Sequence, residues 1–168
     1  SGKRRNILSV PPFYSAEPEF LEELLKKREI PAEDIDNILE FARSQRELAE
    51  KILKNGGITD EIPIISREEF ERHPTVLPLS GMFYGKDICL TYDEYSEHIR
   101  QTERFMQIHE NYIAEFTKAN AFRNLQILIH EGQWAMISKG NAPAIHFVIR
   151  HPKLLSALEN FIPPVIED

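Results

Sequence analysis

Cysteine is nearly absent from the sequence, and its scarcity excludes two common ways of stabilising a small domain. Cys89 is the one cysteine among 168 residues, so the chain can form neither a disulfide framework nor a zinc site built from several thiolates. A chain of this length buries a sizeable core without such cross-links. Because unpaired cysteine is typical of reducing compartments, we expect a cytoplasmic protein, with Cys89 as an inert thiol packed in a strand.

Long apolar runs are also absent. No stretch reaches the roughly 20 apolar residues of a membrane-spanning helix, and no segment has the features of a secretory signal peptide. We therefore expect no membrane partner. The sequence opens on Ser1-Gly2 rather than on Met, which is typical of a cleavage scar and predicts that the chain is a piece of a longer protein.

Positive charge is in short supply. Against 27 Asp and Glu there are 20 Lys and Arg, which gives a formal net charge of −7. Since the phosphate backbone repels such a domain, we predict that the chain does not itself bind DNA. Lys3-Arg4-Arg5 is the exception, and we interpret it as a solubilising or linker segment.

The motifs of common catalytic sites are missing as well. The sequence has no pair of histidines four residues apart with a glutamate between them, no Gly-x-Ser-x-Gly elbow and no glycine-rich phosphate loop. His98 and His109 share one predicted helix, but about three turns separate them, which is too far for one metal ion. We therefore predict no enzyme, no metal and no cofactor.

The N-terminal third is predicted to be helical after an extended lead-in or linker over residues 1–16. Pro18 is a favoured first residue of a helix. A second helix follows Pro31 and ends at Gly56-Gly57. Its apolar stripe has two interpretations, packing on its own domain or forming a dimer seam. We assign residues 17–77 to a helical subdomain and connector, in which Ile62–Ile65, broken by Pro63, forms at best an edge strand.

The remaining residues, 78–168, alternate strands and helices and form the predicted α+β sensor-like domain. Two Ser or Thr residues precede a Glu at capping-box spacing, Ser66 with Glu69 and Thr91 with Glu94, and each pair predicts a helix start. After the second helix, the periodicity predicts four strands in an antiparallel meander, from Tyr112, Leu125, Trp134 and Ala144, and then a closing helix from Pro152. We expect a mostly antiparallel sheet with helices on one face.

One group of polar and aromatic residues is a candidate ligand site. These residues lie at or near predicted strand ends, which a meander brings together: Tyr84, Arg123, Asn124, His130, Trp134, His146 and Arg150. One interpretation is a small pocket for an anionic or polar ligand. The other is ordinary polar strand ends, caps and turn residues.

Two segments carry a resemblance to a known family. They are Phe122-Arg123-Asn124-Leu125-Gln126-Ile127-Leu128-Ile129-His130-Glu131-Gly132 and Ala144-Ile145-His146-Phe147-Val148-Ile149-Arg150-His151-Pro152. From about Leu77 onward the chain resembles the C-terminal regulatory region of bacterial helix-turn-helix transcriptional regulators of the Firmicutes type. The resemblance implies an effector-sensing or dimerising region whose DNA-binding domain lies outside this sequence. It carries no catalytic residue over.

Three functions follow as hypotheses. The first is the regulatory domain of a transcriptional regulator, which we expect to be a homodimer. This domain would either bind a small effector or hold the two copies together, and it would contact DNA only through the missing domain. The second is a protein-interaction or structural module without a ligand. The third is an enzyme with a site dispersed over residues such as His130, His146 and Arg150. The sequence specifies neither an effector nor the regulated genes.

Overall fold

A computed structural model describes residues 2–74, 76–77, 87–118, 125–139 and 145–162. The chain divides into two compact units. Unit 1 comprises Ser1–Ser9, Ile52–Ile64 and Glu110–Asp168, and unit 2 comprises Val10–Lys51 and Ile65–His109. Both units are discontinuous in sequence, whereas the sequence analysis expected boundaries at residues 16 and 77. Among the described helices, none combines the length and apolarity needed to cross a lipid bilayer.

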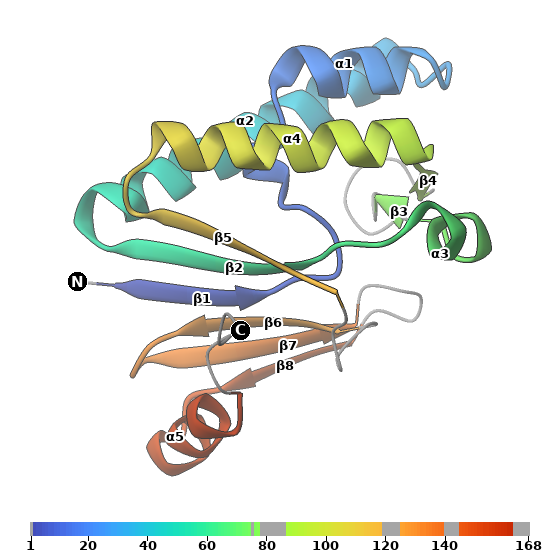
Figure 1. The fold of residues 1–168 in the computed structure, drawn as a ribbon. Helices are drawn as coiled ribbons and strands as arrows, with labels where there is room; N and C mark the ends of the chain where they lie inside the picture. Colours follow the sequence, from blue (N-terminus) through green and yellow to red (C-terminus); the bar gives the residue numbers. More distant parts are fainter. Residues whose placement is uncertain (1, 75, 78–86, 119–124, 140–144, 163–168) are drawn as a thin grey trace. The chain divides into compact units, whose positions relative to one another are not determined.

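One mixed sheet organises unit 1 (Figure 1). In the described residues its six strands lie in the order β5-β2-β1-β6-β7-β8. Their bounds are β1 (Lys3–Ile7), β2 (Gly57–Pro63), β5 (Tyr112–Thr117), β6 (Gln126–His130), β7 (Trp134–Lys139) and β8 (Ile145–Ile149). The β1–β2 and β2–β5 pairings are parallel, and the three pairings from β1 to β8 through β6 and β7 are antiparallel. The predicted α+β class with a mostly antiparallel sheet is confirmed.

Strand β5 does not belong to the meander in which the sequence analysis placed it. It pairs parallel with β2, from Ile58↔Tyr112 to Pro63↔Thr117, at the sheet edge opposite β8. The segment between β2 and β5 contains the helix α4 (Tyr92–Ile108). A helical crossover returns the chain to the same end of a sheet, and this gives a parallel neighbour. The antiparallel meander therefore consists of β6, β7 and β8.

The predicted N-terminal lead-in is extended, but it is a paired strand rather than a linker. β1 lies inside the sheet, with β2 on one side and β6 on the other. Arg4 stacks 5.6 Å from the ring centre of Trp134, and Arg5 pairs with Glu61 at 3.1 Å. The segment Lys3-Arg4-Arg5 was not predicted to be a strand, because the residues that its side chains contact lie far away in the sequence.

The edge strand predicted around Ile62 is wrong. β2 lies between β1 and β5, so it is an interior strand. Pro63 is its last residue, and the β1–β2 register already ends at Ile7↔Glu61. The missing N–H of Pro63 therefore interrupts no hydrogen bond between β1 and β2.

Helix α5 (Pro152–Phe161) closes unit 1 by packing on one face of the sheet. Leu155 and Ile162 form an apolar cluster with strand residues of β1, β6 and β7, and these are Ile7, Ile127, Ile129 and Ala135. Two polar contacts add to it. The Arg5 guanidinium donates to the Ile162 carbonyl at the helix C-terminus, and Glu159 accepts from the Gly132 N–H at 2.9 Å. Gly132 lies in the turn between β6 and β7 with φ of 71°, a conformation that favours glycine.

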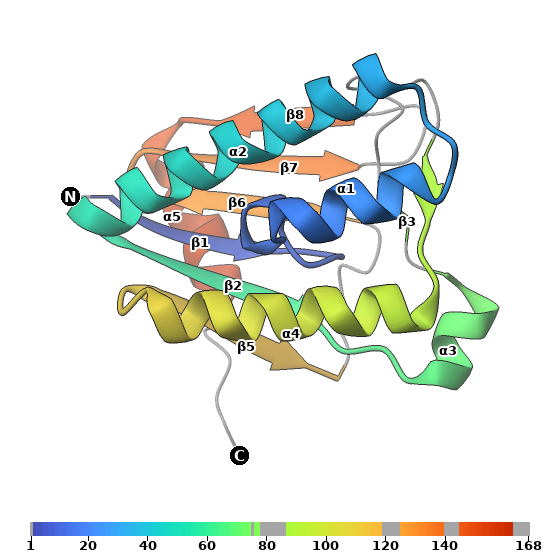
Figure 2. The same cartoon turned by 90° about the horizontal axis from the view of Figure 1, so that it is seen from above.

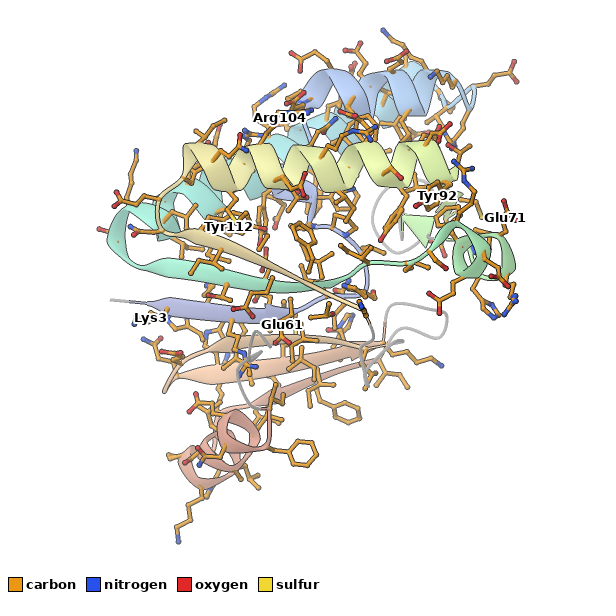
Figure 3. The ribbon with its side chains drawn as sticks, in the orientation of Figure 1. Lys3, Glu61, Glu71, Tyr92, Arg104 and Tyr112 are labelled. Carbon is orange, nitrogen blue, oxygen red and sulfur yellow. The ribbon has the colours of Figure 1, made fainter. Side chains whose placement is uncertain are left out.

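Arg5 links β1, β2 and the end of α5, so its loss should destabilise unit 1. Arg5→Ala should lower the free energy of unfolding by about 2 kcal/mol, because it leaves the Glu61 carboxylate and the Ile162 carbonyl without this donor. Lys3 lies two residues away on the same face of β1 and is exposed (Figure 3). Lys3→Ala is the matched control and should change that free energy by less than about 0.5 kcal/mol. Urea denaturation measures both, and equal effects would contradict the role of Arg5.

Unit 2 is built mainly from helices, and Figure 2 shows α1 between α2 and α4. The helices are α1 (Pro18–Lys26), α2 (Ala32–Asn55, whose last turn belongs to unit 1), α3 (Arg67–Arg72) and α4, with a 3-10 turn η1 (Phe13–Ser15) before α1. A short pair of strands, β3 (Val76–Leu77) and β4 (Ile88–Cys89), completes it. Cys89 is exposed rather than packed, because it faces away from its buried neighbour Ile88.

The predicted helix ends are confirmed, since local chemistry sets them. α1 begins at Pro18, and α2 ends immediately before Gly56. At the start of α4, Thr91 and Glu94 form a complete capping box, and Arg28 reaches Glu94 at 2.6 Å. Partial burial alone would raise the pKa of Glu94, but the hydrogen bonds from Arg28 and from the Thr91 N–H outweigh it and lower that pKa.

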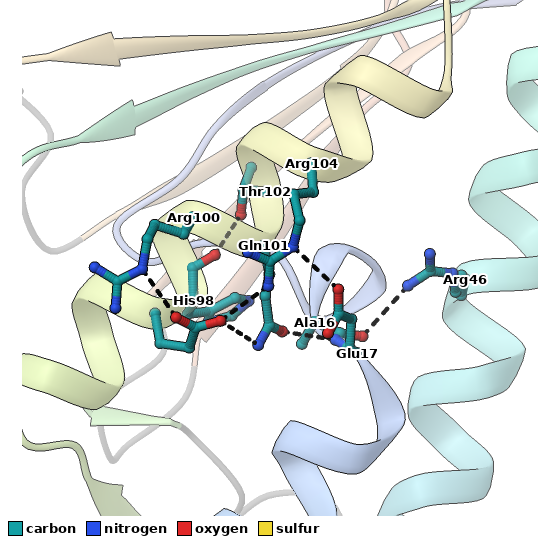
Figure 4. A network of polar contacts seen from close by, with 9 residues as sticks. Ala16, Glu17, Arg46, His98, Arg100, Gln101, Thr102 and Arg104 are labelled. Carbon is teal, nitrogen blue, oxygen red and sulfur yellow. Dashed lines mark hydrogen bonds and ion pairs between the residues drawn. The ribbon is translucent and has the colours of Figure 1, made fainter.

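A buried polar network joins η1 to α4, and Figure 4 shows the contact between Thr102 and His98 within it. His98 Nε2 donates to the Pro12 carbonyl at 3.0 Å. Thr102 lies one turn further along α4, donates to the His98 carbonyl at 3.0 Å and lies 2.8 Å from the Ser15 hydroxyl. His98, Thr102 and Ser15 are each at most 1% exposed. Buried polar groups are tolerated when each finds a partner, as these do.

A more exposed layer of the same network holds the start of α1. The Glu17 N–H donates to the Gln101 side chain at 2.7 Å, and Arg104 bridges Glu17 and Glu97 at 3.2 and 2.9 Å. The hydrogen bonds from Arg104 and Arg100 lower the pKa of Glu97 to about 2. The contacts fix η1 and α1 against α4, and we interpret the network as structural.

The neutral state of His98 makes unit 2 sensitive to acid. Burial lowers the pKa of His98 from 6.5 to about 4, and the Pro12 hydrogen bond offsets part of this effect. The unfolded chain therefore binds the proton more tightly. The contribution of neutral His98 to the free energy of unfolding is fully present above about pH 6.5. It falls as the pH drops toward 4, by a total of about 3 kcal/mol.

Urea denaturation at pH 7.5 and pH 5 tests this dependence. The wild-type chain should lose more free energy of unfolding between the two pH values than His98→Gln, which keeps an N–H donor for Pro12 but cannot titrate. The comparison uses the difference between pH values, so a general loss of stability in the variant does not obscure it. The same pH dependence in both proteins would contradict the prediction.

Candidate functional site

The residues of the predicted ligand pocket fall into two groups. Three lie outside the residues that the structure describes: Tyr84, Arg123 and Asn124. Four lie on or beside the strands β6, β7 and β8 of unit 1: His130, Trp134, His146 and Arg150.

His130 and Trp134 do come together, at the hairpin between β6 and β7. Their rings are 5.9 Å apart, and Arg4 of β1 lies opposite His130 and over Trp134. Burial first and the Arg4 charge second lower the pKa of His130. Both ring nitrogens of His130 are enclosed and have no hydrogen-bond partner among the described residues. A Cβ on Gly2 would lie 2.6 Å from Nε2, so the neighbouring backbone fills the space that a ligand would need.

His146 and Arg150 are separate from that pair. His146 lies opposite Ser138 on β7, and its Nδ1 is 2.8 Å from the Ser138 hydroxyl. Ser138 and Trp134 are four residues apart on one strand, which corresponds to about 13 Å. Arg150 follows the end of β8 and is exposed. The pocket hypothesis therefore stays a prediction that rests on residues outside the described structure.

A second polar cluster, which the sequence analysis did not identify, lies in the middle of the sheet. Asp60 on β2 is 0% exposed. Its carboxylate accepts from the Asn6 amide at 2.7 Å and from the Tyr112 hydroxyl at 2.8 Å. The three side chains come from neighbouring strands, so the cluster fixes the register of β1 and β5 against β2. Full burial keeps Asp60 away from any substrate, and we interpret the cluster as structural.

The most unusual surface of unit 1 is strand β8. In the described residues it pairs with β7 alone, at the edge of the sheet (Figure 1). Its sequence, Ile-His-Phe-Val-Ile, contains no Asp, Glu, Lys, Arg or Pro. Phe147 and Val148 are 61% and 57% exposed, and Ile145 is 43% exposed. Exposed edge strands normally carry charges or proline that prevent pairing with other chains, and β8 carries neither.

Helix α5 adds a second exposed apolar row. Its buried row, which includes Leu155, packs on the sheet. A different row, Leu154, Ala157 and Phe161, follows the spacing i, i+3, i+7 and is exposed, with Leu154 at 60% and Phe161 at 72%. A helix that is apolar on more than one face is typical of one covered on more than one side.

We use the term β8–α5 surface for the exposed apolar residues of these two elements, of which Val148 lies on the opposite face of the sheet from Ile145 and Phe147: Ile145, Phe147, Val148, Leu154, Ala157 and Phe161. All of them belong to unit 1. Both elements were predicted from the sequence, but their exposed apolar surface was not. Two signals were available, the absence of polar alternation in β8 and the number of apolar positions in a helix of ten residues.

Electrostatics set this surface apart from the rest of the chain. Charged residues make up 28% of the sequence with a net charge of −7, and β8 contributes none of them. Two copies that meet through β8 therefore bring no like-charged side chains of that strand together. Exposed apolar residues of this kind are typical of a surface that contacts another macromolecule.

Metal ligands and similarity to known proteins were the two other possible guides to a site. Within the described residues, no group of three or more His, Cys, Asp or Glu side chains is placed to hold a metal ion. Comparison of the chain with models of protein families gives no match, and neither the curated proteins nor the solved structures compared include one that is significantly similar.

Proposed function

We propose that this chain is the dimerising part of the regulatory region of a bacterial helix-turn-helix transcriptional regulator, and that it does not itself bind DNA. The observation that carries the dimerising role is the uncharged, exposed β8–α5 surface. The resemblance of the segments around Leu125–Gly132 and Ala144–Pro152 supplies the class of protein.

The energetics of the surface suit a dimer of moderate strength. Four of its side chains are more than half exposed: Phe147, Val148, Leu154 and Phe161. Burying the exposed parts of these side chains in both copies is worth on the order of 10 kcal/mol. Association costs about 4–15 kcal/mol in lost freedom of motion. Apolar burial alone therefore comes close to the cost, and a stable dimer needs some additional contribution from the interface.

Dimerisation also gives the chain a role compatible with its charge. A chain with a formal net charge of −7 is repelled by DNA. Helix-turn-helix proteins bind paired half-sites as dimers, and the dimer contact sets the distance between the two DNA-binding heads. A dimerising region thus influences DNA binding without touching DNA.

A single substitution at the C-terminal end of the exposed α5 row tests the proposal. Phe161→Lys should raise the dimer dissociation constant by about 100-fold, because each copy loses an apolar contact worth roughly 1.4 kcal/mol and the twofold dimer contains two of them. Light scattering coupled to size-exclusion chromatography, run over a concentration series, measures the effect.

Ile108→Lys is the matched control. Ile108 is 70% exposed, similar to Phe161, but it ends α4 in unit 2. It should leave the dimer unchanged. Circular dichroism verifies that both variants fold. A wild-type chain that stays monomeric over the whole series would contradict the proposal, and so would two variants that weaken the dimer equally. A folded monomer would favour the alternative, an interaction module for a different protein.

A further inference from the structure

We propose that two copies of β8 pair antiparallel across a twofold axis at Phe147, which joins the two sheets into one continuous sheet. This inference rests on the dimer proposed above and adds the geometry of its contact. The hydrogen bonds between the two strands supply the additional free energy of association that apolar burial alone does not provide.

The backbone of β8 is available for such pairing. In the described residues β8 has a neighbour on one side only, so alternate residues direct N–H and C=O groups away from β7. The opposite edge differs. β5 contains Glu115, and of its six residues only Ile113 is exposed. Charge on an edge strand opposes pairing with another chain, which makes β8 the better edge for a second copy.

Symmetry restricts the register. Residues that face each other in an antiparallel pair lie on the same face of the sheet, and the faces alternate along each strand. In a pair of identical strands, facing residues therefore have numbers that differ by an even amount, and one residue lies on the axis. With Phe147 on the axis, all five residues of β8 find a partner, and any other centre leaves some of them unpaired.

The sequence of β8 is close to a palindrome about Phe147. Pairing there places Ile145 against Ile149 of the partner copy and Phe147 against its own counterpart, so one face carries only apolar pairs. On the other face His146 meets Val148 of the partner copy. A centre at His146 would instead place two histidines opposite each other and lose two of the five pairs. The palindrome is the reason to assign this edge to a second copy of the chain rather than to a different protein.

The α5 helices fit the same symmetry. Ile149 packs with the cluster beneath α5, and Phe147 shares its face by alternation. A twofold axis perpendicular to the sheet places the same face of both copies on the same side of the joined sheet. Both α5 helices therefore lie on the same side of the joined sheet as the Phe147 pair, and this side carries most of the apolar contact.

Cysteine cross-linking tests the register. Cys89 is exposed, so all variants carry Cys89→Ser. His146→Cys and Val148→Cys are prepared separately, mixed at equal concentration and oxidised by oxidised glutathione. Facing residues in an antiparallel pair lie about 4.5–5.5 Å apart at Cα, within the range of a disulfide. The mixture should form a covalent dimer of one copy of each variant, about tenfold more than either variant forms alone.

His146→Cys and Val148→Cys both keep Phe147, so this test does not remove the central apolar pair of the proposed dimer. Phe147→Cys is a second measurement and should cross-link with itself, because the two side chains meet at the axis. Light scattering on the same samples under reducing conditions reports whether the dimer exists.

The outcomes separate the two proposals. A dimer whose cross-links show no preference for the mixture, or which cross-links best between identical His146→Cys chains, overturns the β8 register and leaves the dimerising function standing. A monomer in light scattering overturns both. Preferential cross-linking of the mixture, together with self-linking of Phe147→Cys, supports the proposed geometry.

Discussion

The pairing of β1 on both sides is the constraint on which unit 1 depends. β1 pairs parallel with β2 and antiparallel with β6, so it joins the parallel strands to the antiparallel meander. The same short strand supplies Asn6 to the buried Asp60 and Arg5 to Glu61 and the end of α5. Without β1, the two parts of the sheet share no hydrogen-bonded neighbour.

The position of β8 follows from this arrangement. Because β1 occupies the middle, the chain adds β6, β7 and β8 outward on one side, and the last of them becomes an edge. An exposed edge strand without charge promotes unwanted pairing in a monomer, whereas in a dimer it is available to pair with the second copy. The same surface includes the outer row of α5, so the elements added last along the chain are those that we propose meet a second copy.

The sequence predicted features that local chemistry determines. Pro18, Gly56 and the pair Thr91 and Glu94 mark helix ends because a cap depends on residues within one turn. The alternation of Ile127 and Ile129 predicted β6 for a similar reason. His98 and Gln101 were not assigned to the core of α4, because polar residues rarely are, and their partners Pro12 and Glu17 lie more than 80 residues away.

Features that depend on distant partners were missed. The charges of Lys3-Arg4-Arg5 are typical of a linker, and only the folded structure shows Glu61 and Trp134 beside them. Similarly, Pro63 is typical of an edge strand, and only the structure shows that β1 ends before it. The candidate site shows the same limit. The apolar character of β8 is visible in the sequence, but its exposure depends on the order of the strands in the sheet. The pocket hypothesis stays a prediction, since Arg123 and Asn124 lie outside the described residues.

Amide hydrogen exchange, followed residue by residue by NMR at several protein concentrations, tests the central claim most directly. If β8 joins two copies, the amides of β8 that face away from β7 exchange more slowly as the concentration rises. The amides of β5, at the other edge, serve as the internal reference and keep the same rates. Exchange in β8 that is independent of concentration, or that changes in step with β5, would contradict the account.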